Sequence, residues 1–356
     1  MSAPFTDHAP NIARVSLSDQ QAVAQIDAFL AQRDDTTPFH RPAWLQAVQD
    51  GCGQRGHYLV ARRVAGICGL VPLTEIRSAL FGKALVSSGF AVDGGIIADD
   101  HATRRGLTEQ ALSQAKAGGF ATLELRGGTD PAGQGWSIDD STYCGFSADL
   151  ADDEDARLKA VPRKQRAEIR KALASDLVVE IGSARCDREW HYRVYSESVR
   201  NLGTPVFPRK LFSAMLDRFG DDADILTVMH RGEPVASVLS LYHRGTVMPY
   251  WGGGLHAARS LRANEMMYFA LMNHAARRGS TRFDFGRSKT GTGPWSYKKN
   301  WGFEPQPLRY ASWSADGQGR DVNPNSPKYC MMVETWQKLP LPVANLIGPW
   351  IAKGLG

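Results

Sequence analysis

Residues 223–243, ADILTVMHRGEPVASVLSLYH, decide the fold, because a diverged copy of this segment stands earlier in the chain. The segment has two apolar runs with a turn at Arg231–Gly232, which predicts a β-hairpin. Residues 57–76, HYLVARRVAGICGLVPLTEI, follow the same order, with their turn at Ala65–Gly66. The two turn glycines are 232 − 66 = 166 residues apart. This similarity is the first sign of a tandem repeat.

Two further features recur in the same order. The helix-like stretches 106–117 and 263–278 are each followed by a glycine, a residue favoured just after a helix. A short apolar strand with one acidic residue follows each helix, and Glu124 and Asp284 are 284 − 124 = 160 residues apart. Further on, Gly145–Phe146 and Gly302–Phe303 each signal the start of a last strand, at an offset of 302 − 145 = 157.

Three matched features at nearly one spacing predict a duplicated α/β (α+β) unit of hairpin, strand, helix, strand, short helix and strand. Its strand–helix–strand crossover is the element order of the GNAT acyltransferase fold. We therefore expect a tandem GNAT fold with a first lobe over 1–150 and a second over 151–320. The charged segment 151–175 is predicted to be a basic connecting helix, 314–328 a loop, and 321–356 a helical tail that packs back.

Composition fits a folded globular protein, with 356 residues, 43% hydrophobic and 22% charged. A net charge of +5 gives no global nucleic-acid signature, so we expect no DNA partner and only local anion-binding clusters. The cysteines show no metal-ligand spacing, which predicts reduced, mostly buried thiols and no metal site: Cys52, Cys68, Cys144, Cys186 and Cys330. Without a signal-peptide pattern or a long apolar run, a cytoplasmic location is expected.

Residues 264–288, NEMMYFALMNHAARRGSTRFDFGRS, and 297–303, YKKNWGF, resemble the FemAB family of non-ribosomal peptidyltransferases of bacterial cell-wall assembly. The shared pattern is Asn before a helix, a strand ending in Asp-Phe-Gly, an aromatic-Lys-Lys triplet and Gly-Phe. Residues 162–180, PRKQRAEIRKALASDLVVE, are similar to that family's basic helix and the strand after it. The versions TPVFPRKLF (204–212) and FDFGRSKTGTGPWSYKKNWGFEP (283–305) look most like FemAB-related proteins of exosortase (PEP-CTERM) and exopolysaccharide systems.

The resemblance covers roughly residues 35–310 and implies a transferase that acylates an amine, with its acceptor in a groove between two GNAT lobes. Fem enzymes use aminoacyl-tRNA as donor, and some carry a long helical arm thought to hold the tRNA. Only residues 252–263 separate the strand ending at Trp251 from the helix beginning near Asn264, so this chain has no room for the arm. Because armless members exist, aminoacyl-tRNA and acyl-CoA both remain possible donors, and no permanently bound cofactor is expected.

Residues 259–264, RSLRAN, stand where ordinary GNAT enzymes hold the CoA diphosphate with a Gly-rich Q/R-x-x-G-x-G/A turn at a helix N-terminus. Arg259 is kept, but Arg262 and Asn264 replace the two glycines. These replacements weaken a standard CoA site and leave acyl-carrier or altered CoA binding open.

Asp284 and Lys298 are the candidate catalytic residues. Acyl transfer needs a deprotonated amine, a stabilised oxyanion and aligned substrates. Asp284, at a strand end, can accept a proton or orient the amine; capping the next turn or pairing with Arg287 fits equally well. The resemblance assigns Lys298, at the turn into the last strand, to the donor's charge; a solvated lysine is the alternative. In GNAT folds the oxyanion donor is usually a backbone N–H where the central strands splay apart, here strand 246–251.

The loop 286–295, GRSKTGTGPW, predicts a phosphate or diphosphate site, because it combines exposed backbone amides with two cations. A flexible surface loop is the alternative. Arg163, Arg166 and Arg170 share a helix face that suits phosphate or solvent equally. Large aromatic residues near the cleft are more often core. The candidate substrate-binding residues are Trp44, Asp93, Arg163, Arg166, Tyr250, Trp251, Asn264, Arg287, Ser288, Lys289, Tyr297 and Lys299.

Three functions compete. The first is an N-acyl or aminoacyl transferase acting on a nucleotide- or lipid-linked sugar or peptide precursor of the cell envelope or exopolysaccharide. The second is an acyl-CoA-dependent N-acyltransferase acting on an amino sugar. The third is a non-catalytic binding protein, because a fold alone does not establish activity.

The tail is predicted to form two short amphipathic helices broken at Pro340 and Pro342. We expect these helices to pack on a lobe and to bury Leu346, Ile347 and Trp350. Peripheral contact with an anionic membrane is the alternative.

Overall fold

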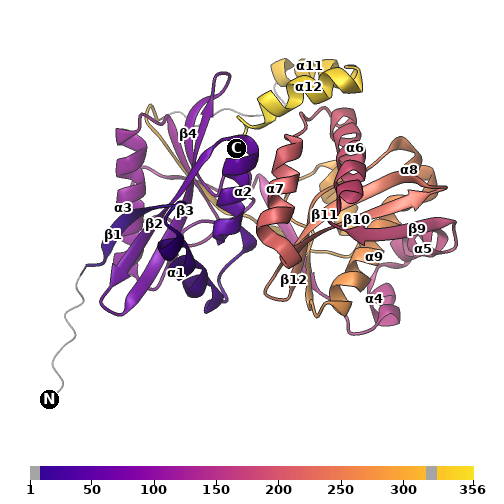
Figure 1. Cartoon of the computed structure of the whole chain (residues 1–356), viewed down its shortest axis with the longest axis horizontal. Helices are drawn as coiled ribbons and strands as arrows, with labels where there is room; N and C mark the ends of the chain where they lie inside the picture. Colours follow the sequence, from indigo (N-terminus) through magenta and orange to yellow (C-terminus); the bar gives the residue numbers. More distant parts are fainter. Residues whose placement is uncertain (1–8, 318–326) are drawn as a thin grey trace. The chain divides into compact units, whose positions relative to one another are not determined.

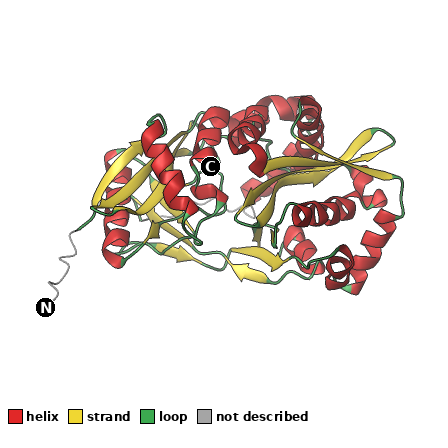
Figure 2. Cartoon of the chain, turned by 60° about the horizontal axis from the view of Figure 1, so that its bottom comes forward, coloured by secondary structure: helices red, strands yellow, loops and turns green. Residues whose placement is uncertain are grey.

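The computed structural model describes residues 9–317 and 327–356, with side chains of the last helix pair described from residue 332 onward. The chain divides into two compact units. Unit 1 comprises residues 1–139, 309–321 and 354–356, and unit 2 comprises residues 140–308 and 322–353. Each unit is built on one sheet (Figure 1), and Figure 2 shows helices on both sides of the strands.

Unit 1 is built on a sheet with strand order β1-β2-β3-β4-β6-β16-β7, and β5 pairs with β3. Leucines of β2, β3, β4 and β6 pack with Leu107 and Ala111 of α3 into one buried cluster. The strands are β1 (Asn11–Ser16), β2 (Arg55–Arg63), β3 (Gly66–Ser78), β4 (Gly82–Ser87), β5 (Ile97–Ala98), β6 (Thr122–Arg126), β7 (Ser137–Asp139) and β16 (Tyr310–Ser314). The helices are α1 (Gln20–Ala31), η1 (Pro38–His40), α2 (Pro42–Cys52) and α3 (His101–Ala117).

Unit 2 has the strand order β14-β8-β13-β12-β11-β10-β9, and β15 pairs with β8. The strands are β8 (Tyr143–Asp149), β9 (Leu177–Gly182), β10 (Ala223–His230), β11 (Glu233–His243), β12 (Thr246–Gly254), β13 (Arg282–Asp284), β14 (Ser288–Lys289) and β15 (Pro305–Pro307). The helices are α4 (Glu154–Ala160), α5 (Arg163–Leu173), α6 (Arg185–Asn201), α7 (Arg209–Phe219), η2 (Gly220–Asp222), α8 (His256–Leu261), α9 (Ala263–Arg277), α10 (Gly293–Asn300), α11 (Pro327–Gln337) and α12 (Leu341–Ala352).

The predicted duplication is confirmed strand by strand. The β10–β11 hairpin turns at Arg231–Gly232 as predicted, and the β2–β3 hairpin turns at Val64–Ala65, one residue before the predicted position. Helices α3 and α9 are the two crossover helices. Strand β6 runs parallel to β4 with Thr122 opposite Ala84, and β13 runs parallel to β12 with Arg282 opposite Thr246. Glu124 and Asp284 are each the third residue of these strands, so they occupy equivalent positions.

The two units exchange their last strands, which differs from the predicted boundary at residue 150. Strand β8 follows the first repeat in the chain but pairs with β13 of unit 2. Strand β16 follows the second repeat but pairs with β6 of unit 1. Gly145–Phe146 lies inside β8, and Gly302–Phe303 follows α10 instead of opening a strand. The residues of a strand do not specify which strand it pairs with, because the pairing depends on segments far away in the sequence.

The predicted connecting helix over 151–175 is two helices, α4 and α5. Asp153 caps α4 by accepting a hydrogen bond from the Ala156 N–H at 2.7 Å. Val161 is extended before Pro162, as expected of a residue that precedes proline. Arg166 of α5 then reaches back to the carbonyl oxygens of Lys159 and Val161, at 2.8 and 3.0 Å. These bonds satisfy the carbonyl groups at the end of α4.

The tail forms two helices with a break at Pro340, as predicted, whereas Pro342 lies in the first turn of α12. The expected burial of the large apolar residues of the tail is wrong. Leu346 is 79% exposed, Trp350 52% and Ile347 38%. Helix α12 instead packs through small residues, and a Cβ on Gly348 would lie 3.1 Å from the Val206 nitrogen. In the described part of the chain, no helix is long and apolar enough to cross a bilayer.

Two other predictions concern residues that lie partly outside the described part of the chain. The predicted loop over 314–328 falls largely outside the described residues, as does the side chain of Cys330. The thiols of Cys52, Cys68 and Cys144 are reduced and buried as expected, whereas Cys186 is exposed.

Candidate active site

The central strands of unit 2 separate as the GNAT order predicts. Strands β12 and β13 pair at only two positions, Thr246 with Arg282 and Val247 with Phe283. Strand β12 then continues to Gly254, seven residues beyond the last paired position. Proline fits a strand only at an edge or a bulge. Pro249 lies in the stretch of β12 that no longer pairs with β13, next to a register shift between β11 and β12 at Tyr250. The stretch after Val247 therefore presents backbone that can serve as an oxyanion donor.

Asp284 lies at the C-terminal end of β13, beside this separation. Its backbone pairs with Ser147 of β8, and its Oδ1 accepts a hydrogen bond from the Gly286 N–H at 2.7 Å. Gly286 has a φ of 68°, which favours glycine and lets the chain turn directly after the strand. The predicted turn-capping role of Asp284 is therefore present, and its half-buried carboxylate faces the start of the 286–295 loop.

Lys298 lies in α10 and not at the turn into a strand as predicted. Its Nζ donates to the carbonyl oxygens of Gly286 and Arg287, both at 3.0 Å, and lies 5.4 Å from the Phe146 ring centroid. Burial lowers the pKa of Lys298 to about 8; the Asp284 carboxylate raises that pKa, and the Arg287 guanidinium lowers it. An ammonium group has three donor hydrogens, and these two carbonyl groups use two of them.

The 286–295 loop is partly ordered by the sheet. Ser288 and Lys289 form β14 against β8, and Ser288 is buried. Arg287 lies with its guanidinium 4.6 Å from the Tyr143 ring centroid, an arrangement that favours a fixed cation. Helix α10 begins at Gly293. Arg287 acts electrostatically on Lys298, so these two cations lie close together; convergence of Lys289 on the same point remains a prediction.

The N-terminal end of α9 is occupied by protein groups. Glu265, in the first turn, is 3.4 Å from both the Gln165 amide nitrogen of α5 and the Tyr297 hydroxyl of α10. Burial and the charge of Glu265 raise the pKa of Tyr297 well above its usual value, so Tyr297 stays a neutral donor. Arg262 precedes the helix with a φ of 57° and donates to Glu168 at 2.9 Å.

Asn264 lies in the same first turn of α9 and is half-buried. Its Oδ1 has no hydrogen-bond partner within the described part of the chain. A Cβ on Gly254 would lie 2.6 Å from this oxygen, so the glycine lets the end of β12 approach the helix. Asn264, the asparagine of the predicted motif, therefore lies where the end of β12 contacts the first turn of α9.

Both tryptophans among the predicted site residues belong to the core, which corrects their assignment to a substrate site. Trp44 is completely buried in unit 1, with its indole N–H donating to the Gly89 carbonyl at 3.1 Å. Trp251 is buried against the Phe212 ring, with centroids 5.3 Å apart. Tyr250, at the bulge, is half-buried and lies edge-to-face on Trp251.

The other predicted residues lie in different surroundings. Arg163 is exposed on α5, whereas Arg166 is engaged by the carbonyl groups of α4. Lys299 is exposed, with its Nζ 4.6 Å from the Trp295 ring centroid. Asp93 lies in unit 1, where its Oδ1 accepts from the Gly94 N–H at 2.6 Å and burial raises its pKa.

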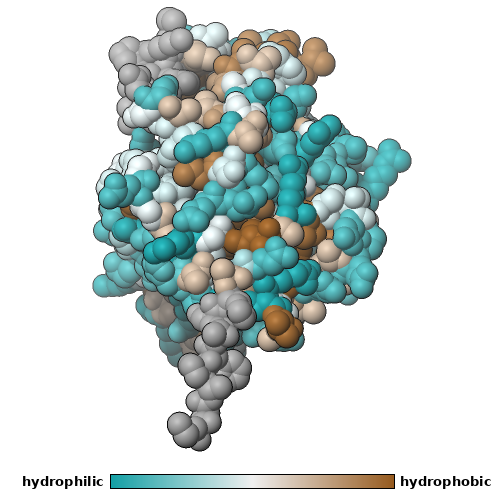
Figure 3. Space-filling view, turned by 90° about the vertical axis from the view of Figure 1, so that its left-hand side faces the viewer, coloured by the Kyte–Doolittle hydropathy of each residue, from teal (hydrophilic) through white to brown (hydrophobic). Residues whose placement is uncertain are grey.

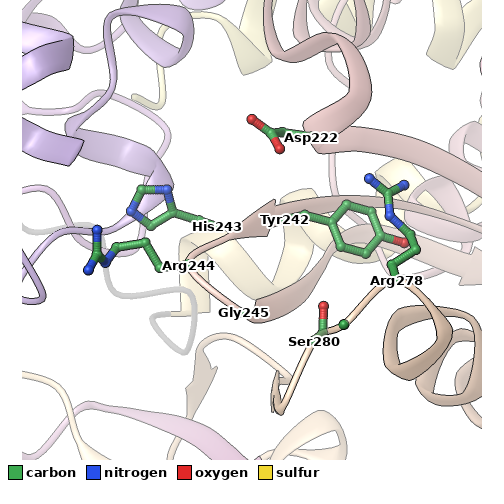
Figure 4. Close-up of a pocket in the computed structure, with 8 residues that line it drawn as sticks. Asp222, Tyr242, His243, Arg244, Gly245, Arg278 and Ser280 are labelled. Carbon is green, nitrogen blue, oxygen red and sulfur yellow. The ribbon is translucent and has the colours of Figure 1, made fainter.

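A cavity of about 190 Å³ lies at the other end of α9, by the β11–β12 turn, and eight residues line it (Figure 4). Arg278 stacks on Tyr242 with its guanidinium 3.9 Å from the ring centroid, and both side chains bond Asp224 at 3.0 Å. His243 and Arg244 point away from this stacked pair (Figure 4). Ligands of parallel sheets bind at the carboxyl ends of the strands, where Asp284 lies, so this cavity is not the candidate site.

The sequence alone did not single out Glu265, which contacts the candidate residue Tyr297, or Phe207, which packs against the core residue Trp251. Glu265 follows Asn264 within the quoted motif. An acidic residue in the first turn of a helix is usually interpreted only as a charge that stabilises the helix. The Phe207 ring lies 6.3 Å from that of Trp251, and Phe207 belongs to the segment TPVFPRKLF. The residue type was visible in both cases, but its neighbours come from distant parts of the chain.

Comparisons with known proteins agree with this architecture. Residues 159–299 match the acetyltransferase (GNAT) domain family. The crystal structure of FemX matches with a TM-score of 0.65 and 14% identity, covering 81% of this chain and 95% of that one. A tandem GNAT protein from the clavulanic acid biosynthesis pathway matches with a TM-score of 0.55 and 14% identity, covering 88% of this chain and 100% of that one.

A third solved structure is the C-terminal domain of a putative lysylphosphatidylglycerol synthetase from Agrobacterium fabrum. Its TM-score is 0.56 at 11% identity, covering 85% of this chain and 94% of that one. A search of curated proteins finds no match. Residues 159–299 match the acetyltransferase (GNAT) domain model, and the chain as a whole has the two-lobed tandem GNAT fold seen in these solved structures.

Proposed function

We propose that the protein transfers an aminoacyl group from an aminoacyl-tRNA to an amine of a nucleotide- or lipid-linked cell-envelope or exopolysaccharide precursor. The observation that carries this proposal is the Asp284–Lys298 pair beside the separation of β12 and β13. The quoted motifs further support a place among the exosortase-associated FemAB-related proteins.

In this proposal Asp284 acts on the acceptor amine and Lys298 acts on the carbonyl group of the donor. The acceptor nitrogen forms an amide bond with the donor's carbonyl carbon, and the ester C–O bond breaks with its electron pair on the tRNA oxygen. The proton that the nitrogen loses ends on that oxygen, so the tRNA leaves as a free hydroxyl. Asp284 orients the amine and accepts its proton. Lys298 directs its third hydrogen, together with a backbone N–H of β12, at the oxygen on which negative charge develops.

The occupied N-terminus of α9 supports an aminoacyl donor over acyl-CoA. A CoA diphosphate held as in ordinary GNAT enzymes would place its charges next to the Glu265 carboxylate, and like charges at that distance repel. Gln165 and Tyr297 also contact Glu265, so α5 and α10 cover this end of the helix. The side chain of Arg262 turns away to Glu168 instead of toward the helix end.

A donor comparison tests this function. The protein is incubated with an amine-bearing, nucleotide-linked sugar-peptide precursor and either total aminoacyl-tRNA or acetyl-CoA, and the precursor is weighed by mass spectrometry. We expect the precursor to gain an aminoacyl group in the first reaction and no mass in the second. An acetylated precursor would instead establish the amino-sugar acetyltransferase, and two unreactive mixtures that bind the precursor would favour the non-catalytic protein.

Removal of two loop cations is expected to weaken binding of the phosphorylated acceptor. In Arg287→Ala/Lys289→Ala we expect about a tenfold or greater increase in Kd, because each charge-assisted phosphate contact contributes about 1.5–3 kcal/mol. Arg105→Ala/Arg231→Ala, which removes two exposed arginines elsewhere, is the matched control. Calorimetric titration with the nucleotide-linked precursor measures the change, and an unaltered Kd would show that the loop does not contact the phosphates.

A further inference from the structure

The outward face of helix α12 is apolar. Its twelve residues include no charged side chain. Val343, Leu346, Ile347 and Trp350 are exposed and follow the i, i+3, i+4, i+7 spacing, which places them on one face of a helix. The opposite face, formed by Ala344, Gly348 and Ala352, is buried.

The packing of α12 fixes this orientation. A surface helix usually turns its large apolar residues inward and its polar residues to water, and α12 does the reverse. Gly348 lets the helix approach the Val206 backbone, and the Asn345 amide donates to Ser196 Oγ of α6 at 3.3 Å. The large residues cannot turn inward without pushing the helix off α6, because the buried face has room only for small side chains.

Neighbouring elements extend the apolar surface. Leu202, at the end of α6, and Met332 of α11 are 62% and 53% exposed. They lie near each other because a Cβ on Gly203 would meet the Val333 side chain. Figure 1 shows α11 and α12 (yellow) next to each other. In the space-filling view of Figure 3, apolar residues (brown) gather near the top and in smaller groups on a mainly polar (teal) face.

The apolar face is too small for a stable protein interface. Even with Leu202 and Met332 included, these half-exposed side chains offer an apolar patch of roughly 300–600 Å², the size of the largest patch on a typical monomer. A stable protein partner buries about 800 Å² on each side. An interfacial helix needs only to insert such a face into the boundary between lipid headgroups and acyl chains.

The charges around α12 also favour a lipid surface. Residues 338–356 contain no acidic residue, and Lys338 and Lys353 stand at the two ends of the helix. A twelve-residue helix is about 18 Å long, shorter than the hydrocarbon core of about 30 Å. We propose that α12 lies flat in the interface of an anionic membrane, with Leu346 and Trp350 inserted and the lysines at the phosphate groups. This inference does not depend on the proposed activity.

Vesicle flotation of the full chain tests the inference. We expect the protein to float with vesicles of phosphatidylcholine and phosphatidylglycerol and to float less with phosphatidylcholine alone. Leu346→Gln/Trp350→Gln should reduce the floated fraction about tenfold, and Lys338→Gln/Lys353→Gln should abolish the preference for anionic vesicles. Val64→Gln/Val178→Gln, which changes two exposed apolar residues elsewhere, should float like the wild type.

Two results would overturn the inference. One is a wild-type protein that stays at the bottom of the gradient with both kinds of vesicle. The other is a dimer in sedimentation equilibrium that Leu346→Gln/Trp350→Gln turns into a monomer, because the face would then be a contact between copies of this chain. Five of the six substituted residues are exposed and Lys353 is partly exposed, so we expect each variant to keep the wild-type Tm within a few degrees.

Discussion

Lys298→Met is expected to lower the rate of group transfer about 100- to 1,000-fold, the loss typical of removing one donor to a developing oxyanion. Methionine keeps the length and the apolar stem of the side chain but donates no hydrogen to Gly286, Arg287 or the substrate. Single-turnover transfer from the donor identified above measures the rate. Lys83→Met, at an exposed lysine of unit 1 outside the candidate site, is the matched control and should stay within about threefold of the wild type.

The stability of Lys298→Met separates catalysis from folding. In the wild type the folded-state pKa of this lysine lies below the ordinary 10.5 because of burial, so the unfolded chain binds more protons between pH 8 and 10.5. The free energy of unfolding therefore rises with pH across that window. Methionine removes this dependence, so a variant that is inactive but folded, with a flatter stability profile above pH 8, supports the assignment.

Asp224→Ala is expected to lower the free energy of unfolding by about 3 kcal/mol, at the low end of the cost of breaking a buried ion pair. Asp224 is buried and accepts hydrogen bonds from Tyr242, His274 and Arg278, at 3.0, 2.9 and 3.0 Å. Without the carboxylate, Tyr242 loses its buried partner, while the partly exposed Arg278 regains water. Urea denaturation followed by circular dichroism measures the loss.

Asp176→Ala is the matched control for this prediction. Asp176 also pairs with a histidine and an arginine, His230 at 3.2 Å and Arg231 at 3.7 Å, but its side chain is mostly exposed. Exposed ion pairs contribute about 0–1 kcal/mol, so the control should change stability little. Equal losses in the two variants would show that the Asp224 cluster is not a stabilising element of unit 2.

Local sequence patterns predicted the helices and strands of this fold. They did not predict which strands pair or which faces are covered, because those features depend on non-local contacts. Apolar runs around Gly66 and Gly232 identified both hairpins, and the acidic residues Glu124 and Asp284 identified equivalent strands. The exchange of β8 and β16 was not predictable, because a strand's own residues do not specify which sheet edge it completes. Likewise, the spacing of Leu346 and Trp350 defined an apolar face without showing whether anything covers it.

The sequence predicted which residues belong to the candidate site better than it predicted where they lie. Asp284 ends its strand as expected, but Lys298 lies in a helix whose start was marked by Pro294, a residue favoured in the first turn of helices. Trp44 was predicted in the site but lies in the core. The sequence pattern of an aromatic residue beside a predicted cleft is the same whether the side chain lines the cleft or packs in the core. Only its buried indole bond to Gly89 distinguishes the two.

The central claim is that Asp284 and Lys298 act as one pair in group transfer, and the pH dependence of single-turnover transfer tests it most directly. Lys298 must carry its proton, so the rate of the wild type should fall as the pH rises through about 8. Asp284→Asn removes the charge that raises this pKa and should move the fall to lower pH, and Lys298→Arg should abolish it. A fall that keeps the same midpoint in both variants would contradict the account.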